Sequence, residues 1–485
     1  MPAQLNDHLI QRCMIHLGAR EIGRNFFLLY IAVILIAPSL HAQQKPLLLS
    51  EAIARGVGAY QNIKAKQFYI QSSQALVKNA RNERLPDVVA SLQQDFGTVN
   101  GLFGPLSAYG AMGISSSGPT HPGQNWNAGF GAAYIMNTHW EFFTFGRLNS
   151  RISLSKAQVS KDSADLAQEA FMLSAKIAGA YLNLIIIRKI ADNANANLRR
   201  TQYIQEVVQA RTLSGLNAGV DSSIANAGVA SARLALIASQ DNELQARNQL
   251  AQLLNTDPLL PIVVDTAYLE NTPQQFDADT DIALNPQARF YDARIRVSDQ
   301  YADYLKKSIL PGLNLFGIYQ ARGSGFDYNY SPSLDAYSKN YWEGIKPSRS
   351  NYVAGISIAW NILSIKKIKE QEAAQRFISN AYQQEYDLLS AQLKSQLALS
   401  DQRIFNSLLA LKEAPIQYKA ATDAYNQKSV LYKNGLTNII DVQQALYAMN
   451  KAETDLAGAY IQVWQALLLK AAASGDFDLF LKQIR

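Results

Sequence analysis

The hydrophobic and polar positions of the chain follow two periods, one typical of helices and one typical of strands. Long stretches repeat apolar residues at helical spacing, as Leu389, Leu393 and Leu397 do, and predict helices. Four shorter stretches alternate apolar with polar or small residues and predict strands, at about residues 87–97, 126–137, 312–322 and 351–363. The chain is therefore predicted to be mainly α-helical, with a small β-sheet.

Alternation gives each predicted strand one apolar face. In the fourth strand the apolar positions are Tyr352, Ala354, Ile356, Ile358, Trp360 and Ile362. Trp126 marks the start of the second strand. Each strand has about the length that a tilted strand needs to cross a bilayer. The connections 98–124 and 323–350, rich in Gly, Ser, Tyr and Pro, resemble the long outer loops of a membrane barrel.

A soluble antiparallel sheet would show the same alternation, so this alternative stays open. If the strands do lie in lipid, four of them cannot close a barrel. Several copies of the chain must then share their strands, because an open sheet edge is not tolerated in a membrane.

The predicted helices are unusually long. Residues 147–213 and 365–433 contain almost only helix formers, and at about 1.5 Å per residue each would extend about 100 Å. Helices of that length need neighbours along their whole length, as in coiled coils. A shorter helix is predicted from near Ser50 to about Glu83, ending before Pro86, and the segment 256–281, with three prolines, is predicted to be an irregular link.

Landmarks recur in the same order in the two halves of the chain. Helical segments close on Pro86 and on Pro311, 225 residues apart, and a Gly-Leu pair begins at Gly215 and again at Gly435, 220 residues apart. An aspartate follows each of these glycines by six residues, at Asp221 and Asp441. The pattern predicts two structural repeats, residues 43–265 and 266–485, each with two strands and long coiled-coil helices.

Residues 1–42 are predicted to be a secretory signal peptide. The apolar run 26–40 follows Arg20 and Arg24 and precedes Ala42, a small residue suited to cleavage. An uncleaved amino-terminal anchor is the alternative, and Met14 could be the true start. The sole cysteine, Cys13, precedes the apolar run, so the mature chain is expected to have no thiol and no disulfide.

Composition and motifs argue against catalysis. Only His121 and His139 follow the predicted cut, and the chain contains no H-E-x-x-H, Walker A or G-x-S-x-G sequence. We therefore expect no enzyme activity, no cofactor and no metal. The net charge of +6 is scattered among acidic residues on helix faces, so a nucleic-acid partner is not expected.

The two turns between predicted helices, SGLNAGVDS (214–222) and NGLTNIIDV (434–442), are the strongest candidates for function. Glycine suits the left-handed residue that ends a helix, and the polar residues that follow can cap the next helix. Well-formed turns would account for the glycines alone. They would not account for the leucine and the aspartate that both halves share.

The mature sequence resembles the TolC-like outer-membrane efflux protein family over nearly all of its length. The resemblance is carried by LLLSEAIARGVGAYQNIKAKQ, HWEFFTFGRLNSRI, NPQARFYDARIRVSDQYADYLKKSILPGLNL and above all YKNGLTNIIDVQQALYAMNKAETDL. It implies a homotrimer with a 12-stranded barrel in the cell outer membrane and a 12-helix tunnel in the periplasm.

The resemblance also implies a function. The chain would be the passive exit duct of a tripartite efflux pump or a type I secretion system, opened by a periplasmic adaptor protein and an inner-membrane pump of the RND or ABC type. The remaining alternative is an exported coiled-coil structural or interaction protein with a soluble β cap. The exported substrate does not follow from the sequence.

Residue roles carried over from the family fall on the two turns. Adaptor contacts would be Gly215, Leu216, Gly435 and Leu436. The periplasmic gate would be formed by Asp221, Tyr432, Thr437, Asp441 and Gln444, with Asp441 facing the pore. Gln444 replaces a second pore aspartate and Thr437 replaces an arginine found in relatives. The entrance is therefore expected to carry about three negative charges, and its latch to rely on hydrogen bonds.

Overall fold

The computed structural model describes residues 46–102, 120–258, 262–278 and 281–483. The predicted signal peptide, with Cys13 and Met14, lies outside the described residues. The chain is mainly helical with one sheet, as predicted. The principal helices are α2 (Leu49–Ala59), α3 (Gln61–Asn82), α4 (Arg147–Leu213), α5 (Gly219–Leu254), α6 (Pro286–Lys307), α7 (Tyr341–Ile345), α8 (Ser364–Lys433), α9 (Ile439–Ser474) and α10 (Asp478–Leu481).

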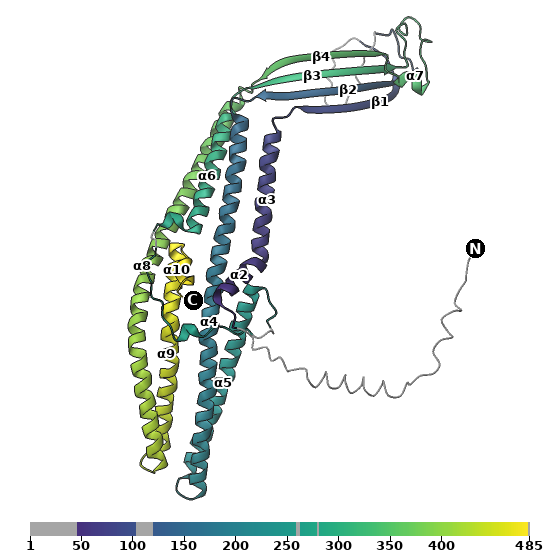
Figure 1. The fold of residues 1–485 in the computed structure, drawn as a ribbon. Helices are drawn as coiled ribbons and strands as arrows, with labels where there is room; N and C mark the ends of the chain where they lie inside the picture. Colours follow the sequence, from purple (N-terminus) through teal and green to yellow (C-terminus); the bar gives the residue numbers. More distant parts are fainter. Residues whose placement is uncertain (1–45, 103–119, 259–261, 279–280, 484–485) are drawn as a thin grey trace, which may run out of the picture.

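The strands are β1 (Asp87–Thr98), β2 (Ala128–Phe143), β3 (Gly312–Ser324) and β4 (Arg349–Ala359). They form one antiparallel sheet in the order β1-β2-β3-β4. Figure 1 shows this sheet at one end of the molecule, turned away from the helices, with the two helix-to-helix turns at the opposite end.

The strand register brings the predicted apolar positions onto one side of the sheet. Leu92 lies opposite Tyr134, and Tyr319 lies opposite both Met136 and Tyr352. We call this side the apolar face; it comprises Val88, Ala90, Leu92, Phe96, Phe130, Ala132, Tyr134, Met136, Trp140, Leu313, Leu315, Tyr319, Ala321, Tyr352, Ala354, Ile356 and Ile358. The other side, the polar face, carries Asp87, Ser91, Gln93, Asp95, Asn137, His139, Glu141, Asn314, Gln320, Asn351 and Ser357, together with the apolar Val89, Ile135, Phe316, Ile318 and Val353. Gln94, Thr138 and Ser350 are polar residues on the apolar face.

The ends of β2 and β4 differ from the prediction. Strand β2 begins after Trp126 and runs on to Phe143, because β3 continues to offer partners as far as Leu313, past an irregularity in the pairing. Strand β4 ends at Ala359, so that Trp360 and Ile362 follow it. Ala359 pairs with Gly312, the first residue of β3. The residue before Gly312 is Pro311, which has no N–H to extend the ladder.

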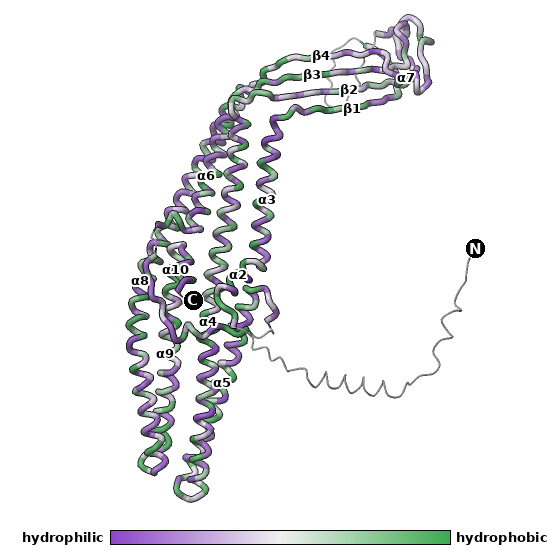
Figure 2. The backbone as a smooth tube through the Cα atoms, in the orientation of Figure 1, coloured by the Kyte–Doolittle hydropathy of each residue, from purple (hydrophilic) through white to green (hydrophobic). Residues whose placement is uncertain are grey.

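The long helices α4 and α8 extend along the whole helical part, as predicted from their uninterrupted composition (Figure 1). Helices α3 and α5 pack against successive parts of α4, and α6 and α9 pack against successive parts of α8. Helix α4 also contacts α6 and α9, which joins the two groups. Figure 2 shows polar and apolar residues mixed along these helices, as expected when several sides of a helix have different neighbours.

The helix predicted from near Ser50 to about Glu83 is broken at Tyr60. Tyr60 is extended (φ −69°, ψ 123°) and separates α2 from α3. Helix α2 buries Leu49 and Ile53 in the core, and its Gly56 lies so close to α4 that a Cβ there would be 2.4 Å from Cδ1 of Ile177. The break lets α2 pack into the core while α3 continues along α4.

A tryptophan side chain bonds to the backbone at two connections between a helix and a strand, α3 to β1 and α6 to β3. Nε1 of Trp140 donates to the carbonyl of Arg84 at 2.8 Å, and Nε1 of Trp360 donates to the carbonyl of Ile309 at 2.9 Å. The two donors lie 220 residues apart and the two acceptors 225, the same offsets as the sequence landmarks. Each bond satisfies a carbonyl left at the end of a helical segment.

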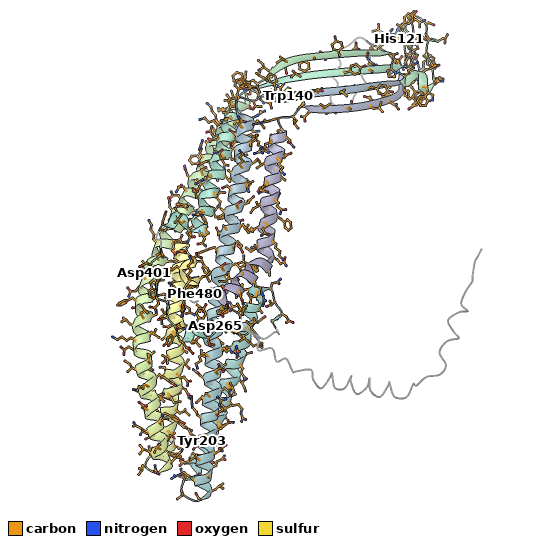
Figure 3. The ribbon with its side chains drawn as sticks, viewed as in Figure 1. His121, Trp140, Tyr203, Asp265, Asp401 and Phe480 are labelled. Atoms are coloured by element: carbon orange, nitrogen blue, oxygen red, sulfur yellow. The ribbon has the colours of Figure 1, made fainter. Side chains whose placement is uncertain are left out.

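The main core lies midway along the helices, where Tyr181, Trp464 and Phe480 are fully buried; Figure 3 labels Phe480 and Asp265 there. The Tyr181 hydroxyl donates to the carbonyl of Leu47 at 2.6 Å and accepts from the Asp265 N–H at 2.8 Å. Burial raises the pKa of Tyr181 to about 12. Helix α4 contains one stretch apolar enough to span a membrane by composition, with 44% of it buried inside the protein, and this core accounts for much of that burial.

Candidate functional site

The two helix-to-helix turns lie side by side at the end of the molecule farthest from the sheet (Figure 1). Gly215 (φ 73°) and Gly435 (φ 75°) both take the left-handed conformation, as predicted. The N–H of Leu216 bonds to the carbonyl of Arg211, and that of Leu436 to the carbonyl of Leu431, both at 2.9 Å. These bonds end α4 and α8 in the same way and set each turn's direction.

The starts of the following helices differ between the two turns. The Asn438 side chain caps α9 by accepting from the N–H of Asp441 at 2.8 Å. The corresponding residue at the start of α5 is Ala218, which has no side-chain cap. The only amide side chain in the first turn, Asn217, bonds sideways instead. The predicted cap is thus found in one turn and replaced by a different contact in the other.

Arg211 joins the hairpin α4–α5 to the hairpin α8–α9. Its Nε donates to Oδ1 of Asn217 at 2.9 Å, and its Nη1 donates to the carbonyl of Lys433, the last residue of α8, at 2.8 Å. The guanidinium also lies over the Tyr432 ring, 5.6 Å from its centroid. A cation is favourable at this position, because the carbonyl end of a helix carries partial negative charge.

Asn217 connects Asp221 to Tyr432. Its Nδ2 donates to Oδ2 of Asp221 at 2.8 Å and to the hydroxyl of Tyr432 at 2.9 Å. The sequence predicted a network of Asp221 and Tyr432; in the structure an amide stands between them. Tyr432 is only 5% exposed, and burial together with the nearby Asp221 carboxylate raises its pKa.

In a second contact between the hairpins, the cation belongs to α8 and the aromatic ring to α4. Lys433 of α8 places its Nζ 5.1 Å from the ring centroid of Tyr203 on α4, which Figure 3 labels near the tip. An apolar layer backs both contacts and comprises Ile204, Val208, Ala225, Tyr432, Ile439, Val442, Leu446 and Met449. The tip is therefore a packed contact between two hairpins, held by cations on aromatic rings.

Farther from the tip the contact between α4 and α9 becomes polar. Arg200 donates from Nη1 to Oδ1 of Asn450 at 2.9 Å and to Oε2 of Glu453 at 3.1 Å, and Asn450 bonds to Asn197. If the helices separate, polar groups such as these can exchange their protein partners for water. This exchange costs less free energy than exposing buried apolar groups to water.

Asp441 has its own partners within the hairpin α8–α9. Oδ2 accepts from Nζ of Lys428 at 2.8 Å and from the hydroxyl of Thr437 at 2.7 Å. The Lys428 bond, followed by the Thr437 bond, lowers the pKa of Asp441. Asp441 is thus an ionised carboxylate whose charge is balanced by a lysine of the same chain.

The other predicted residues fall at the surface of the tip. Leu216 is 69% exposed and Leu436 is 72% exposed, unusual values for leucine next to a packed layer. Gln444 is exposed on the first turns of α9. Thr437 bonds to Asp441 rather than to the Asp221 network.

Sequence reasoning missed Arg211, Asn217 and Lys428. Arg211 and Lys428 look like ordinary basic residues in the last turns of long helices, and Asn217 looks like a turn residue. Their roles depend on contacts across two hairpins or two helices, which no local pattern contains. The one available signal was the asymmetry between Asn217-Ala218 in the first turn and Thr437-Asn438 in the second.

Comparisons with known proteins agree with this architecture. Residues 58–256 match the family model described as "Outer membrane efflux protein". No protein of curated function matches the sequence. Several solved outer-membrane channels have the same fold. The CmeC outer membrane channel of Campylobacter jejuni superposes with a TM-score of 0.71 at 13% identity, over 88% of this chain and 85% of its own.

Two further solved structures are also similar. VceC, an outer membrane protein of Vibrio cholerae, gives a TM-score of 0.69 at 14% identity, over 88% of this chain and 96% of its own. The open state of the MtrE outer membrane channel of Neisseria gonorrhoeae gives 0.68 at 17% identity, over 88% of each chain.

The fold defines the class: a sheet with one apolar face joined to paired helical hairpins, as in outer-membrane channels. The match of residues 58–256 to the outer membrane efflux protein model agrees with the resemblance found in the sequence, and the solved channels share the fold of the chain. This family and the similar structures are channels rather than enzymes.

Proposed function

We propose that this protein is the outer-membrane exit duct of an efflux or secretion assembly. The observation that carries the proposal is the sheet, whose apolar face is exposed although its residues are large; Tyr352 is 85% exposed and Ile356 69%. A face of this kind needs lipid or another protein against it. The opposite face carries carboxylates and amides, which suit a water-filled lumen.

The duct is a homotrimer. Strands β1 and β4 are the two edges of the sheet, and almost all of their residues are exposed. Three copies would bring twelve strands together and pair each β4 with the β1 of a neighbour, which leaves no open edge in lipid. Exposed apolar side chains such as Phe68 on α3, Leu234 on α5 and Phe377 on α8 support a matching contact between helices of neighbouring copies.

The two hairpins form a gate, which is closed when they pack against each other at the tip. Arg211, Asn217 and Tyr432 act as a latch between them, and Asp221 orients Asn217. Removing two hydrogen bonds and the two cation–aromatic contacts would cost on the order of 3 kcal/mol per protomer. Separation of the hairpin α8–α9 from α4–α5 is the opening movement, a change between two packed arrangements.

A periplasmic adaptor opens the gate by binding the tip. Leu216 and Leu436 are exposed beside Gly215 and Gly435. The lack of a side chain at Gly215 leaves room for an approaching backbone, whereas Nη2 of Arg211 lies 3.4 Å from the position of a Cβ on Gly435. An adaptor that contacts both turns in the open arrangement, and only one in the closed arrangement, would shift the equilibrium by the difference in binding. An inner-membrane pump of the RND or ABC class would supply the substrate.

The pore entrance has little net charge. Each Asp441 is balanced by Lys428 at 2.8 Å, and Gln444 adds no charge. Instead of the three negative charges expected from the sequence, a ring of Asp441 and Lys428 from three copies would be close to neutral. We infer weak ion selectivity at the entrance and weak binding of polyvalent cations.

A soluble coiled-coil scaffold with a β cap is the rival. It would leave the apolar face exposed to water unless a second protein covered it. Membranes from cells that express the full chain are extracted with buffer, with alkaline carbonate and with detergent, and the extract is added to planar bilayers. Release by detergent alone, trimers that dissociate on heating, and stepwise conductance support the duct; release by buffer with no conductance would exclude it.

A further inference from the structure

Helix α7 lies on the apolar face, at the end of the sheet away from the helices. It belongs to the connection between β3 and β4 and packs against β2 and β3 (Figure 1). The Tyr134 hydroxyl donates to the carbonyl of Ile345 at 2.9 Å, and the rings of Phe130 and Tyr341 meet edge to face at 5.2 Å. Phe130 and Tyr134 both belong to the apolar face, so α7 sits on that side of the sheet.

Two glycines allow this close contact. A Cβ on Gly344 would lie 2.5 Å from Cβ of Phe130, and a Cβ on Gly323 would lie 2.7 Å from the carbonyl oxygens of Ile345 and Lys346. Both distances are shorter than any tolerated contact between carbon or oxygen atoms. Helix α7 is therefore seated on the strands rather than suspended above them. Its Ile345 is buried, and Ala132 and Ala321 beneath it are buried as well.

Helix α7 carries an exposed aromatic residue and is flanked in the sequence by two exposed lysines. Trp342 is 73% exposed, a high value for the largest side chain. Lys339 and Lys346, at the two ends of the segment 339–346, are exposed, and Glu343 is the one acidic residue of that segment. An exposed tryptophan between two lysines is typical of protein surfaces that sit at the border of a membrane.

The position of α7 along the strands agrees with that border. Phe130, beneath α7, and Trp140, at the opposite corner, are about ten residues apart on β2, which at about 3.3 Å per residue and a tilt of about 40° gives about 25 Å. That height matches the apolar band of membrane barrels, which is also about 25 Å. Trp140 and α7 thus mark the two borders of the band.

We propose that α7 and its flanking residues bind the phosphate-bearing headgroups of the outer leaflet of the outer membrane. The Trp342 indole lies between headgroups and acyl chains, while the ammonium groups of Lys339 and Lys346 donate to lipid phosphates. This inference rests on the proposed function in one respect, that the sheet is in the membrane. It adds a lipid partner of stated chemistry and a fixed place for it.

A lipid headgroup fits better than a free phosphate ion or a peptide. The two lysines stand at opposite ends of an exposed helix rather than around an enclosed cavity, so no closed anion site is formed. They adjoin an apolar surface that acyl chains can cover, which a free ion cannot do. A peptide strand would need a free edge next to α7, but β2 and β3 below it are both paired within the sheet.

The test compares lipid binding by purified full-length wild type and by the variant Lys339→Gln/Lys346→Gln. Native mass spectrometry counts lipid A molecules retained per oligomer, with phosphatidylcholine as the neutral lipid and sodium phosphate as the free-ion competitor. The control variant, Lys412→Gln/Lys419→Gln, removes two exposed lysines at the same spacing from the middle of α8. A third variant, Trp342→Ala, tests the aromatic contribution.

We expect wild type and the α8 control to retain lipid A at least tenfold more tightly than the α7 double variant does, with no effect of free phosphate. Equal retention by the α7 double variant, or full competition by free phosphate, would overturn the proposal. Conductance is measured on the same samples. If all variants form channels and retain lipid A equally, only the lipid-binding inference is wrong. If wild type forms no channels, the proposed function is wrong.

Discussion

Nδ2 of Asn217 donates a hydrogen bond to the hydroxyl of Tyr432 at 2.9 Å, across the boundary between two helical hairpins whose residues are 215 apart in the sequence. The same Nδ2 donates to Asp221, and Oδ1 of Asn217 accepts from Arg211. One amide therefore connects a cation, a carboxylate and a phenol. If the hairpins separate when the duct opens, the bond from Asn217 to Tyr432 must break, whereas Arg211 and Asp221 belong to the same hairpin as Asn217 and move with it.

Loss of the Tyr432 hydroxyl should favour the open state. Tyr432→Phe keeps the ring in its apolar layer and removes one hydrogen bond of about 1 kcal/mol per protomer, hence about 3 kcal/mol per trimer, or roughly a hundredfold change in the open-to-closed ratio. Single-channel recording in planar bilayers measures that ratio. Replacing Asp221 and Tyr432 together should raise conductance further.

The matched control for this substitution is Tyr447→Phe, which removes a hydroxyl from a side chain that is 72% exposed on α9. Its open probability should equal that of wild type. Equal open probabilities for Tyr432→Phe and Tyr447→Phe would show that the Tyr432 hydroxyl does not hold the hairpins together.

Lys428→Met should make the pore entrance sensitive to polyvalent cations. Without the ammonium, the Asp441 carboxylates would form an uncompensated negative ring that can bind such a cation. We expect block by hexammine cobalt at concentrations at least tenfold lower than for wild type. Block at the same concentration in both proteins would show that Lys428 does not screen Asp441 in the assembled channel.

The same ion pair predicts a pH dependence. The pKa of Asp441 is lowered in the folded chain, so the contribution of the pair is complete above the ordinary aspartate pKa and is lost only as pH falls through the lower folded value. Wild-type conductance should therefore stay constant from pH 7 to about pH 5, with no transition from this group. In Lys428→Met the pKa of Asp441 should rise, so that its charge is lost at higher pH.

Charge on the two sides of β4 should have opposite consequences. Ile356→Arg places a cation on the apolar face, with an expected cost of about 2–4 kcal/mol if that face meets lipid near the bilayer centre. Its neighbour Ser357→Arg places the same group on the polar face and should leave insertion intact while changing conductance. Fractions of folded trimer in outer membranes, read from heat-modifiable migration, compare the two. Equal yields would contradict a lipid-facing apolar side.

The two tryptophan corners should contribute independently to stability. Trp140→Phe and Trp360→Phe each remove one hydrogen bond of about 1 kcal/mol to a helix-end carbonyl. The sites share no partner, so the losses should add in the double variant. The heating temperature at which half of the trimers dissociate reports the effect, and a double variant no weaker than either single one would contradict independent corners.

Local patterns were sufficient for the long helices and for the faces of the strands. Helix α4 occupies the predicted residues 147–213, because its sequence contains no proline and is rich in alanine, leucine and other helix formers. Alternation assigned Leu92, Tyr134 and Ile356 to one side, and the register places them there. These features depend on the period of one segment alone.

Features set by a second segment could not be predicted in the same way. Strand β4 ends at Ala359 because its partner β3 begins at Gly312, and the helix near Tyr60 breaks because α2 packs on Ile177 of α4. The Arg211 latch and the Lys428 pair join residues from different hairpins or helices. The resemblance to a known family pointed to Asp221 and Tyr432 but did not include Asn217, which lies between them.

In the proposed duct, several copies of this chain share their strands to close one membrane cylinder. Native mass spectrometry of protein extracted from outer membranes in detergent tests it most directly. We expect three copies per particle, with monomers appearing only after heating. A monomer that stays in solution without detergent would contradict it.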